Sequence, residues 1–130
     1  METGARQAKM REMLQTVFGR APSPTAPRPS QPSDKHLGVL TEVLFGEIWS
    51  RPALEPRERS LVTLSALVAL NREEQIESHI RGALNQGISK EKVLEVILHL
   101  AFYSGAPTAH SAFGIANEVF RQWDAEKARA

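Results

Sequence analysis

Residues 56 to 70 read PRERSLVTLSALVAL, and this stretch decides the fold. Pro56 suits the first turn of a helix, where a missing backbone N–H costs nothing. After the charged opening, apolar residues fall on every side of the helix. A helix without a polar stripe is buried on most of its sides. The sequence therefore predicts a central helix over residues 56–70, with the other elements packed around it.

The segments on both sides of this helix carry apolar residues at helical spacing. Pro52 stops one of these segments, Gly87 suits a left-handed cap after another, and Ser89 suits the N-cap of the next. No segment alternates apolar and polar residues with a period of two, so no strand is expected. The predicted fold class is all-α, with helices over 5–18, 34–49, 56–70, 73–85, 89–103 and from Pro107 onward.

The composition changes sharply between residues 21 and 33, where five of the residues are proline. Such a stretch leaves almost no backbone donors, so we expect an extended strap or an inert surface spacer. The helical core is expected over residues 34–124. Because 130 residues is the length of one domain, the whole chain is predicted to be a single domain, 1–130.

Charge and cysteine content exclude several classes of function. The formal net charge is +1, from 16 basic and 15 acidic residues without a block of either sign, so no nucleic acid partner is expected. No stretch approaches the roughly 18 apolar residues of a membrane-spanning helix, and no signal-peptide pattern opens the chain. We therefore expect a cytoplasmic protein without a membrane partner. The absence of cysteine excludes disulfides, thiolate metal sites and thiol redox chemistry.

From Phe45 onward, short motifs follow one another in a fixed order. They are FGEIWSRP at 45–52, RERSLVT at 57–63, ALNR at 69–72, HIRGALN at 79–85, EVILH at 95–99, YSGAP at 103–107 and SAF at 111–113. With this set, which spans roughly residues 45–120, the chain resembles the carboxymuconolactone decarboxylase family of the alkylhydroperoxidase D-like superfamily. The resemblance implies a compact six-helix bundle that assembles into a homo-oligomer, a trimer or a hexamer.

The resemblance is to the branch of the superfamily without redox cysteines. The redox relatives carry Cys-x-x-Cys followed four residues later by His. Alignment of that signature on His79 puts Arg72 and Gln75 in the cysteine positions. Neither side chain can form a thiolate, so thiol peroxidase activity is excluded.

The activity that the resemblance implies is the decarboxylation of a small carboxylated lactone such as 4-carboxymuconolactone, in the degradation of aromatic compounds. Electrons left by the departing CO2 flow through the ring double bond to the lactone carbonyl, so no cofactor and no metal are expected. The protein would stabilise charge at the carbonyl oxygen, hold the carboxylates and supply a proton. Two alternatives are a related cofactor-free enzyme acting on a different or larger substrate in a biosynthetic pathway, and a non-catalytic ring-forming binding protein.

Three residues are candidates for catalysis. His79 is the first, because it borders the inward stripe of its helix and an imidazole titrates near neutral pH; a core histidine bonded to a backbone carbonyl fits the pattern equally well. His99 is the second, since Glu95, His99 and Tyr103 recur every four residues and share a helix face. Glu58 matches the acidic relay residue of the redox relatives, although the helix dipole also favours a carboxylate there.

Four further residues are candidates for substrate binding. Arg51 and Arg81 could clamp substrate carboxylates with paired hydrogen bonds, although Glu77 lies four residues before Arg81 and a surface ion pair explains it nearly as well. Tyr103 would supply a hydroxyl. His110 is a third histidine near the start of the last helix, but its spacing from the others has no value as a metal motif.

Overall fold

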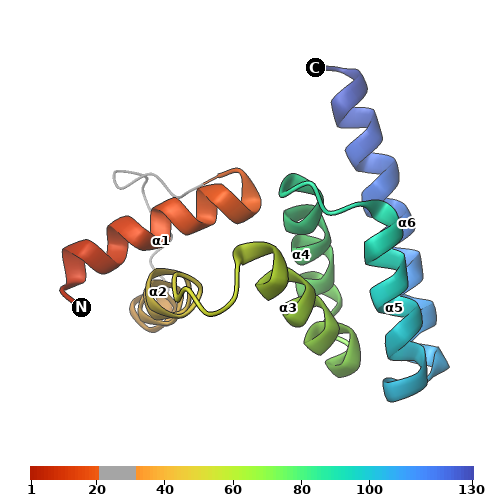
Figure 1. Cartoon of the computed structure of the whole chain (residues 1–130), viewed down its shortest axis with the longest axis horizontal. Coiled ribbons are helices and arrows are strands. Elements are labelled where there is room, and N and C mark those ends of the chain that lie inside the picture. Colours follow the sequence, from red (N-terminus) through yellow and green to blue (C-terminus); the bar gives the residue numbers. More distant parts are fainter. Residues whose placement is uncertain (21–31) are drawn as a thin grey trace. The chain divides into compact units, whose positions relative to one another are not determined.

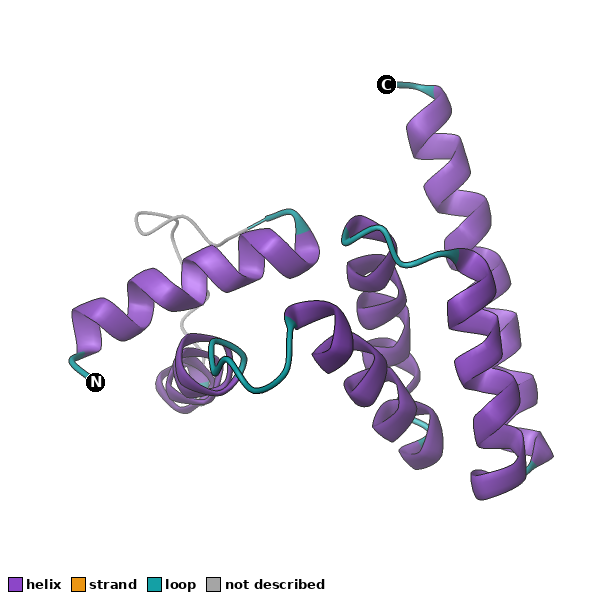
Figure 2. Ribbon diagram, viewed as in Figure 1, coloured by secondary structure: helices purple, strands orange, loops and turns teal. Residues whose placement is uncertain are grey.

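A computed structural model describes residues 1–20 and 32–130. In these residues every regular element is helical and none is a strand (Figures 1 and 2). The elements are α1 (Thr3–Phe18), α2 (Asp34–Val43), the π-helical turn η1 (Leu44–Ile48), α3 (Pro56–Leu70), α4 (Glu73–Asn85), α5 (Lys90–Ser104) and α6 (Ala106–Ala128). The predicted all-α class is confirmed. Most of the proline-rich segment, residues 21–31, lies outside the described residues, and its role as a strap stays a prediction.

The chain divides into two compact units, residues 1–56 and residues 57–130. Each unit has a hydrophobic core of its own. The prediction of a single domain over 1–130 therefore stays a prediction.

In the first unit, α1 packs against α2 and η1. Its core consists of Met10, Leu14, Val17, Phe45 and Trp49. The helix expected over 34–49 is α-helical only to Val43, after which the backbone widens to a π turn in which the Trp49 amide donates to the Leu44 carbonyl at 2.9 Å. Gly46 in this turn lies directly against α1, because a Cβ there would be 2.5 Å from the Arg6 carbonyl oxygen.

The second unit is a bundle of α3, α4, α5 and α6. In Figure 1, α3 and α5 run in one direction and α4 and α6 return. The predicted helix ends are confirmed: α3 begins at Pro56, Gly87 has a positive φ of 80° after α4, and the Ser89 hydroxyl accepts from the Lys92 amide at 3.2 Å. The core of the unit is built from Leu64, Val68, Ile76, Ile80, Ala83, Ile88, Val93, Ile97, Ala109, Ala112, Ala116, Val119 and Phe120.

The prediction that α3 is buried on most of its sides is wrong for the single chain. Ser60, Leu64 and Val68 face the core, while Val62 and Leu70 are 59% and 61% exposed. The composition of a helix indicates that its apolar faces are contacted by other protein surfaces. It does not indicate whether those surfaces belong to the same chain or to another one.

The C-terminal helix α6 is held to the bundle by ion pairs along its last turns. The Lys90 ammonium lies 2.7 Å from the Asp124 carboxylate, and an Arg81 guanidinium nitrogen lies 3.3 Å from the Glu126 carboxylate. Phe120 belongs to the core of the unit, and Trp123 is half-buried under the Lys127 side chain. None of the described helices combines the length and the apolar character needed to cross a membrane.

Candidate functional site

The second unit contains a cavity of about 330 Å³ between α3 and α5. Its apolar lining comes from Leu61, Val96 and Leu100. Its polar lining comes from Ser65, Lys92, Glu95 and His99. The cavity thus combines apolar side chains, which can contact a small ring or chain, with an ammonium, a carboxylate, a hydroxyl and an imidazole.

Helical spacing explains why these side chains meet. Lys92, Glu95 and His99 follow one another at intervals of three and four residues, so they lie on one face of α5. Tyr103 continues this face one turn later, and its ring lies 5.0 Å from the His99 ring between centroids. The predicted sharing of a face by His99 and Tyr103 is therefore confirmed, and Glu95 and His99 line the same cavity.

The opposite wall is formed by α3, where Leu61 and Ser65 are one turn apart. Glu58 lies seven residues before Ser65, which is two helical turns, so it occupies the same side of α3. Glu58 is exposed and does not itself line the cavity. The helix register thus places Glu58 and His99 on the two helices that form the cavity.

Lys92 and Glu95 are available to a ligand. Within residues 1–20 and 32–130, the Lys92 ammonium and the Glu95 carboxylate take part in no ion pair. The cavity therefore offers one cationic and one anionic group one helical turn apart. Lys92 and Ser65 were not among the candidates from the sequence. The run Lys92, Glu95, His99 at helical spacing is the signal that could have drawn attention to Lys92.

His79 lies half-buried on α4, with its Nδ1 atom shielded from solvent. Gln86, the residue directly after α4, donates from Nε2 to the Ser60 hydroxyl on α3 at 2.6 Å. The end of α4 therefore lies against α3. His79 lines neither the α3–α5 cavity nor the cavity of the first unit.

Burial lowers the pKa of His79 below its ordinary value of 6.5, because an imidazolium loses hydration there. The folded chain therefore binds a proton at His79 less readily than an imidazole in water does. The unfolded chain binds a proton at this residue more readily than the folded chain does, so protonation favours unfolding. The contribution of His79 to the free energy of unfolding is therefore present above pH 6.5 and is lost as the pH falls below it. A neutral imidazole suits a hydrogen bond to a carbonyl oxygen better than it suits the delivery of a proton.

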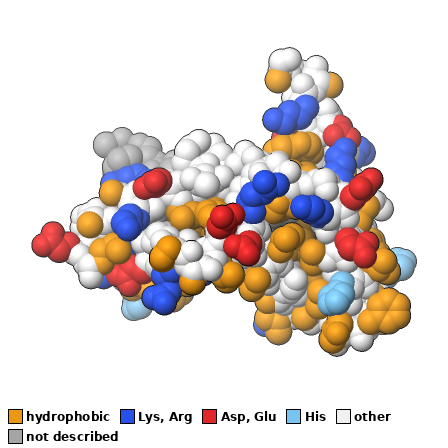
Figure 3. Space-filling model, in the orientation of Figure 1, with side chains coloured by type: hydrophobic (Ala, Val, Ile, Leu, Met, Phe, Trp, Pro, Cys, Tyr) orange, Lys and Arg blue, Asp and Glu red, His pale blue; other side chains and the backbone are white. Residues whose placement is uncertain are grey.

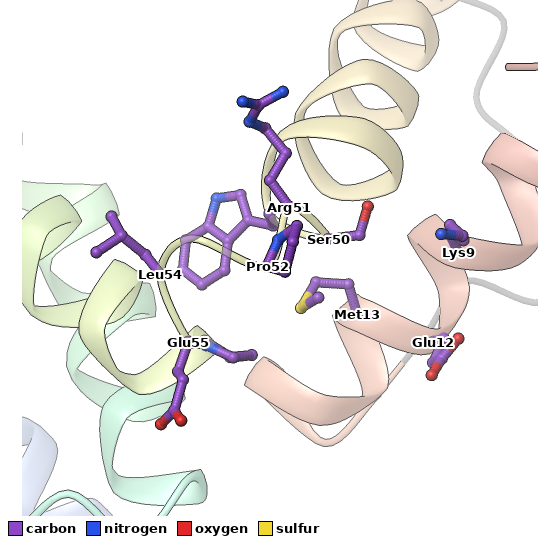
Figure 4. A pocket seen from close by; sticks show the side chains of 10 residues that line it. Lys9, Glu12, Met13, Ser50, Arg51, Pro52, Leu54 and Glu55 are labelled. Atoms are coloured by element: carbon purple, nitrogen blue, oxygen red, sulfur yellow. The ribbon is translucent and has the colours of Figure 1, made fainter.

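A second cavity, of about 320 Å³, lies within the first unit (Figure 4). It is lined by Lys9, Glu12, Met13, Trp49, Ser50, Arg51, Pro52, Leu54, Glu55 and Pro56. Figure 4 shows the Arg51 side chain extending away from Met13. Its rim carries two basic and two acidic residues, so the local charge is balanced. Arg51, a predicted substrate clamp, lines this cavity and not the one that His99 lines.

The other predicted binding residues lie outside both cavities. The Arg81 guanidinium lies 4.0 Å from Glu77 and 3.3 Å from Glu126, and it also donates to Gln122. These contacts match the surface ion pair weighed against a substrate role. His110 is exposed in the first turns of α6. In the described part of the chain no three His, Asp or Glu side chains come together as metal ligands, and the metal-free site stays a prediction.

The sequence model of the carboxymuconolactone decarboxylase family matches residues 35–118, which contain both walls of the α3–α5 cavity. The chain belongs to this family. All seven candidate residues lie within the matched range. Six of them belong to the second unit, and Arg51 belongs to the first. The absence of cysteine places the chain among family members without a thiol redox motif.

Individual relatives are similar over parts of their length. The 4-carboxymuconolactone decarboxylase of Acinetobacter baylyi is 42% identical over 82 residues, which are 63% of this chain and 61% of that protein. The nitrosuccinic acid decarboxylase of Metarhizium robertsii is 35% identical over 74 residues, which are 57% of this chain and 52% of that protein. An uncharacterised 15.0 kDa protein of Paracoccus denitrificans is 29% identical over 100 residues, which are 75% of this chain and 71% of that protein. The chain thus spans between half and two thirds of the first two relatives.

Proposed function

We propose that this chain is a decarboxylase of small carboxylated lactones of the 4-carboxymuconolactone kind, working without a cofactor in the degradation of aromatic compounds. The observation that carries the proposal is the α3–α5 cavity, which His99 and Lys92 line together with Leu61, Val96 and Leu100. Decarboxylation of such a lactone needs a proton donor for the carbanionic carbon, and an imidazole supplies one at neutral pH. The names of two relatives, both decarboxylases, support the reaction type.

Position at the α3–α5 cavity supports a role for His99. His99 is assigned the proton transfer, because it lines the cavity, and Tyr103 stacks against its ring and supplies a hydroxyl. Glu58 stays a candidate relay residue; it lies on α3 two turns before Ser65 and does not line the cavity. His79 stays a candidate for a hydrogen bond to the carbonyl oxygen, although it lines neither cavity. Arg51, Arg81 and His110 stay candidates for substrate binding. The Arg81 guanidinium already forms an ion pair with Glu126.

The direct test is incubation of the purified chain with 4-carboxymuconolactone. We expect loss of the lactone with release of one CO2 per molecule consumed, with no added metal or organic cofactor and with no change after treatment with a chelator. The measurement is CO2 release together with the ultraviolet absorbance of the lactone. Absence of turnover under all these conditions would count against this substrate.

A second candidate is decarboxylation of a different acid in a biosynthetic pathway, and the nitrosuccinic acid decarboxylase among the relatives favours it. Nitrosuccinate and 4-carboxymuconolactone each carry an electron-withdrawing group that accepts the electrons left by CO2. Each also keeps a second carboxylate that does not leave. Parallel assays with both acids separate the two candidates by their kcat/KM values. Tight binding of either acid without turnover would favour the third candidate, a non-catalytic binding protein.

We also propose that the chain forms a homo-oligomer, a trimer or a hexamer. At the end of α5, Phe102 and Tyr103 are 85% and 78% exposed, and Leu98 is exposed beside them. Figure 3 shows hydrophobic side chains gathered over this end of the second unit, at the lower right, next to histidines. Apolar patches of this kind mark contacts between proteins, and closed symmetry is the usual arrangement.

The Phe102→Glu variant is expected to shift the molar mass from light scattering towards the single chain, because a buried carboxylate would oppose the contact. Asn117→Glu, at an exposed polar residue of α6, serves as the matched control and is expected to keep the assembly. A wild-type chain that is monomeric at micromolar concentration would contradict the proposal.

A further inference from the structure

The α3–α5 cavity has a cation that the sequence did not single out. Lys92 lines the cavity from the first turn of α5, one turn before Glu95 and two turns before His99. Its ammonium takes part in no ion pair with any other described residue. Lys92 is exposed, so its ammonium is accessible, and a cation beside apolar side chains can bind an organic anion.

We infer that Lys92 is the carboxylate-binding residue of this cavity, and that it holds the carboxylate of the ligand that does not react. The reaction itself rests on the proposed function, but the binding of a carboxylate by Lys92 can be tested without turnover. The ligand class is a small organic acid with one carboxylate at the Lys92 end and a ring or short apolar chain over Leu61, Val96 and Leu100.

The arginines predicted from the sequence are less suited to this role in the second unit. Arg81 is committed to Glu77, Glu126 and Gln122 along α4 and α6, so binding a substrate would cost those contacts. It also lies outside the cavity that His99 lines. Lys92 shares both the cavity and the helix face with His99, which puts the anchor and the imidazole two turns apart.

Glu95 makes the charge of the cavity lining differ along α5, with a cation at Lys92 and an anion one turn later. Its carboxylate lies between Lys92 and His99 along the same face of α5. The negative charge of Glu95 repels a second carboxylate of the ligand. This repulsion ends when the ligand carboxylate leaves as neutral CO2. The arrangement therefore favours one retained carboxylate at Lys92 and loss of charge on the Glu95 side.

The test uses two ligands. Muconolactone has the lactone ring and the acetate carboxylate but lacks the ring carboxylate that would leave as CO2. Its methyl ester has the same ring and no charge. Binding to the wild-type chain and to Lys92→Met is measured by isothermal titration calorimetry. We expect muconolactone to bind about tenfold or more weakly to Lys92→Met, as for loss of a charge-assisted hydrogen bond, and the methyl ester to bind both proteins equally. Lys92→Arg should restore most of the affinity for muconolactone.

The matched control is Lys90→Met, which removes the same charge from the same helix outside the cavity. It should leave muconolactone affinity within about twofold, because exposed charges at this distance are screened by salt. Equal affinity of wild type and Lys92→Met for muconolactone, with both variants folded by circular dichroism, would overturn the inference, as would an equal loss in both lysine variants. Muconolactone binding that depends on Lys92, in a chain that does not turn over 4-carboxymuconolactone, would uphold the inference and refute the proposed function alone.

Discussion

Replacement of His99 by alanine is expected to lower kcat for CO2 release from 4-carboxymuconolactone by about 100- to 10,000-fold, the usual contribution of a positioned acid or base. His99 lines the α3–α5 cavity, and its ring is held against Tyr103 at 5.0 Å. Because the imidazole serves the proton transfer and not the retained carboxylate, KM should change much less than kcat. Steady-state kinetics over a range of pH values measure both constants.

His36→Ala is the matched control, because His36 is exposed on α2 and lines neither cavity. It should keep the wild-type rate. His79→Gln is the informative comparison, since the amide can replace the hydrogen bond of a neutral imidazole but cannot transfer its proton. Full activity of His99→Ala together with inactivity of His79→Gln would assign the proton transfer to His79 and reverse the roles proposed here.

The second large effect is expected for Leu64→Ala in the core of the second unit. Leu64 is fully buried on α3 and packs against residues of the other helices of the bundle. Its truncation removes apolar contacts and leaves a cavity, which costs about 2–5 kcal/mol of the free energy of unfolding. For a unit of this size the loss corresponds to a decrease of about 10 °C or more in Tm. Thermal unfolding followed by circular dichroism provides the measurement.

Val62→Ala on the same helix is the control for this change. Val62 is 59% exposed, so its truncation should alter the free energy of unfolding by no more than about 0.5 kcal/mol. Two variants of equal stability would mean that α3 does not pack as described. The pair thus tests directly which face of α3 is covered within one chain.

The helices of this protein could be predicted because their ends are set by local chemistry. Pro56 opens α3, the Ser89 hydroxyl caps α5, and Gly87 takes the left-handed conformation after α4. Each of these signals acts within a few residues of the helix end. The change from α- to π-helix at Leu44 could not be predicted, since it accompanies the close approach of Gly46 to Arg6, forty residues away along the chain.

The candidate site was only partly predictable for the same reason. His99 and Tyr103 belong to one helix, so their spacing already placed them on one face. Ser65 and Lys92 come from different helices, and nothing in the local pattern joins them. The engagement of Arg81 by Glu126 likewise depends on where α6 packs.

The amino-acid sequence by itself determined the helical class, the helix ends, the family and the absence of thiol chemistry. These properties depend on spacing, capping and residue type, which act locally along the chain. Only the tertiary structure decided that one face of α3 is left exposed, that burial lowers the pKa of His79, and that Ser65 of α3 lines one cavity with Lys92 and His99 of α5. Burial and charge balance depend on side chains contributed by distant segments, and those neighbours exist only once the helices have packed.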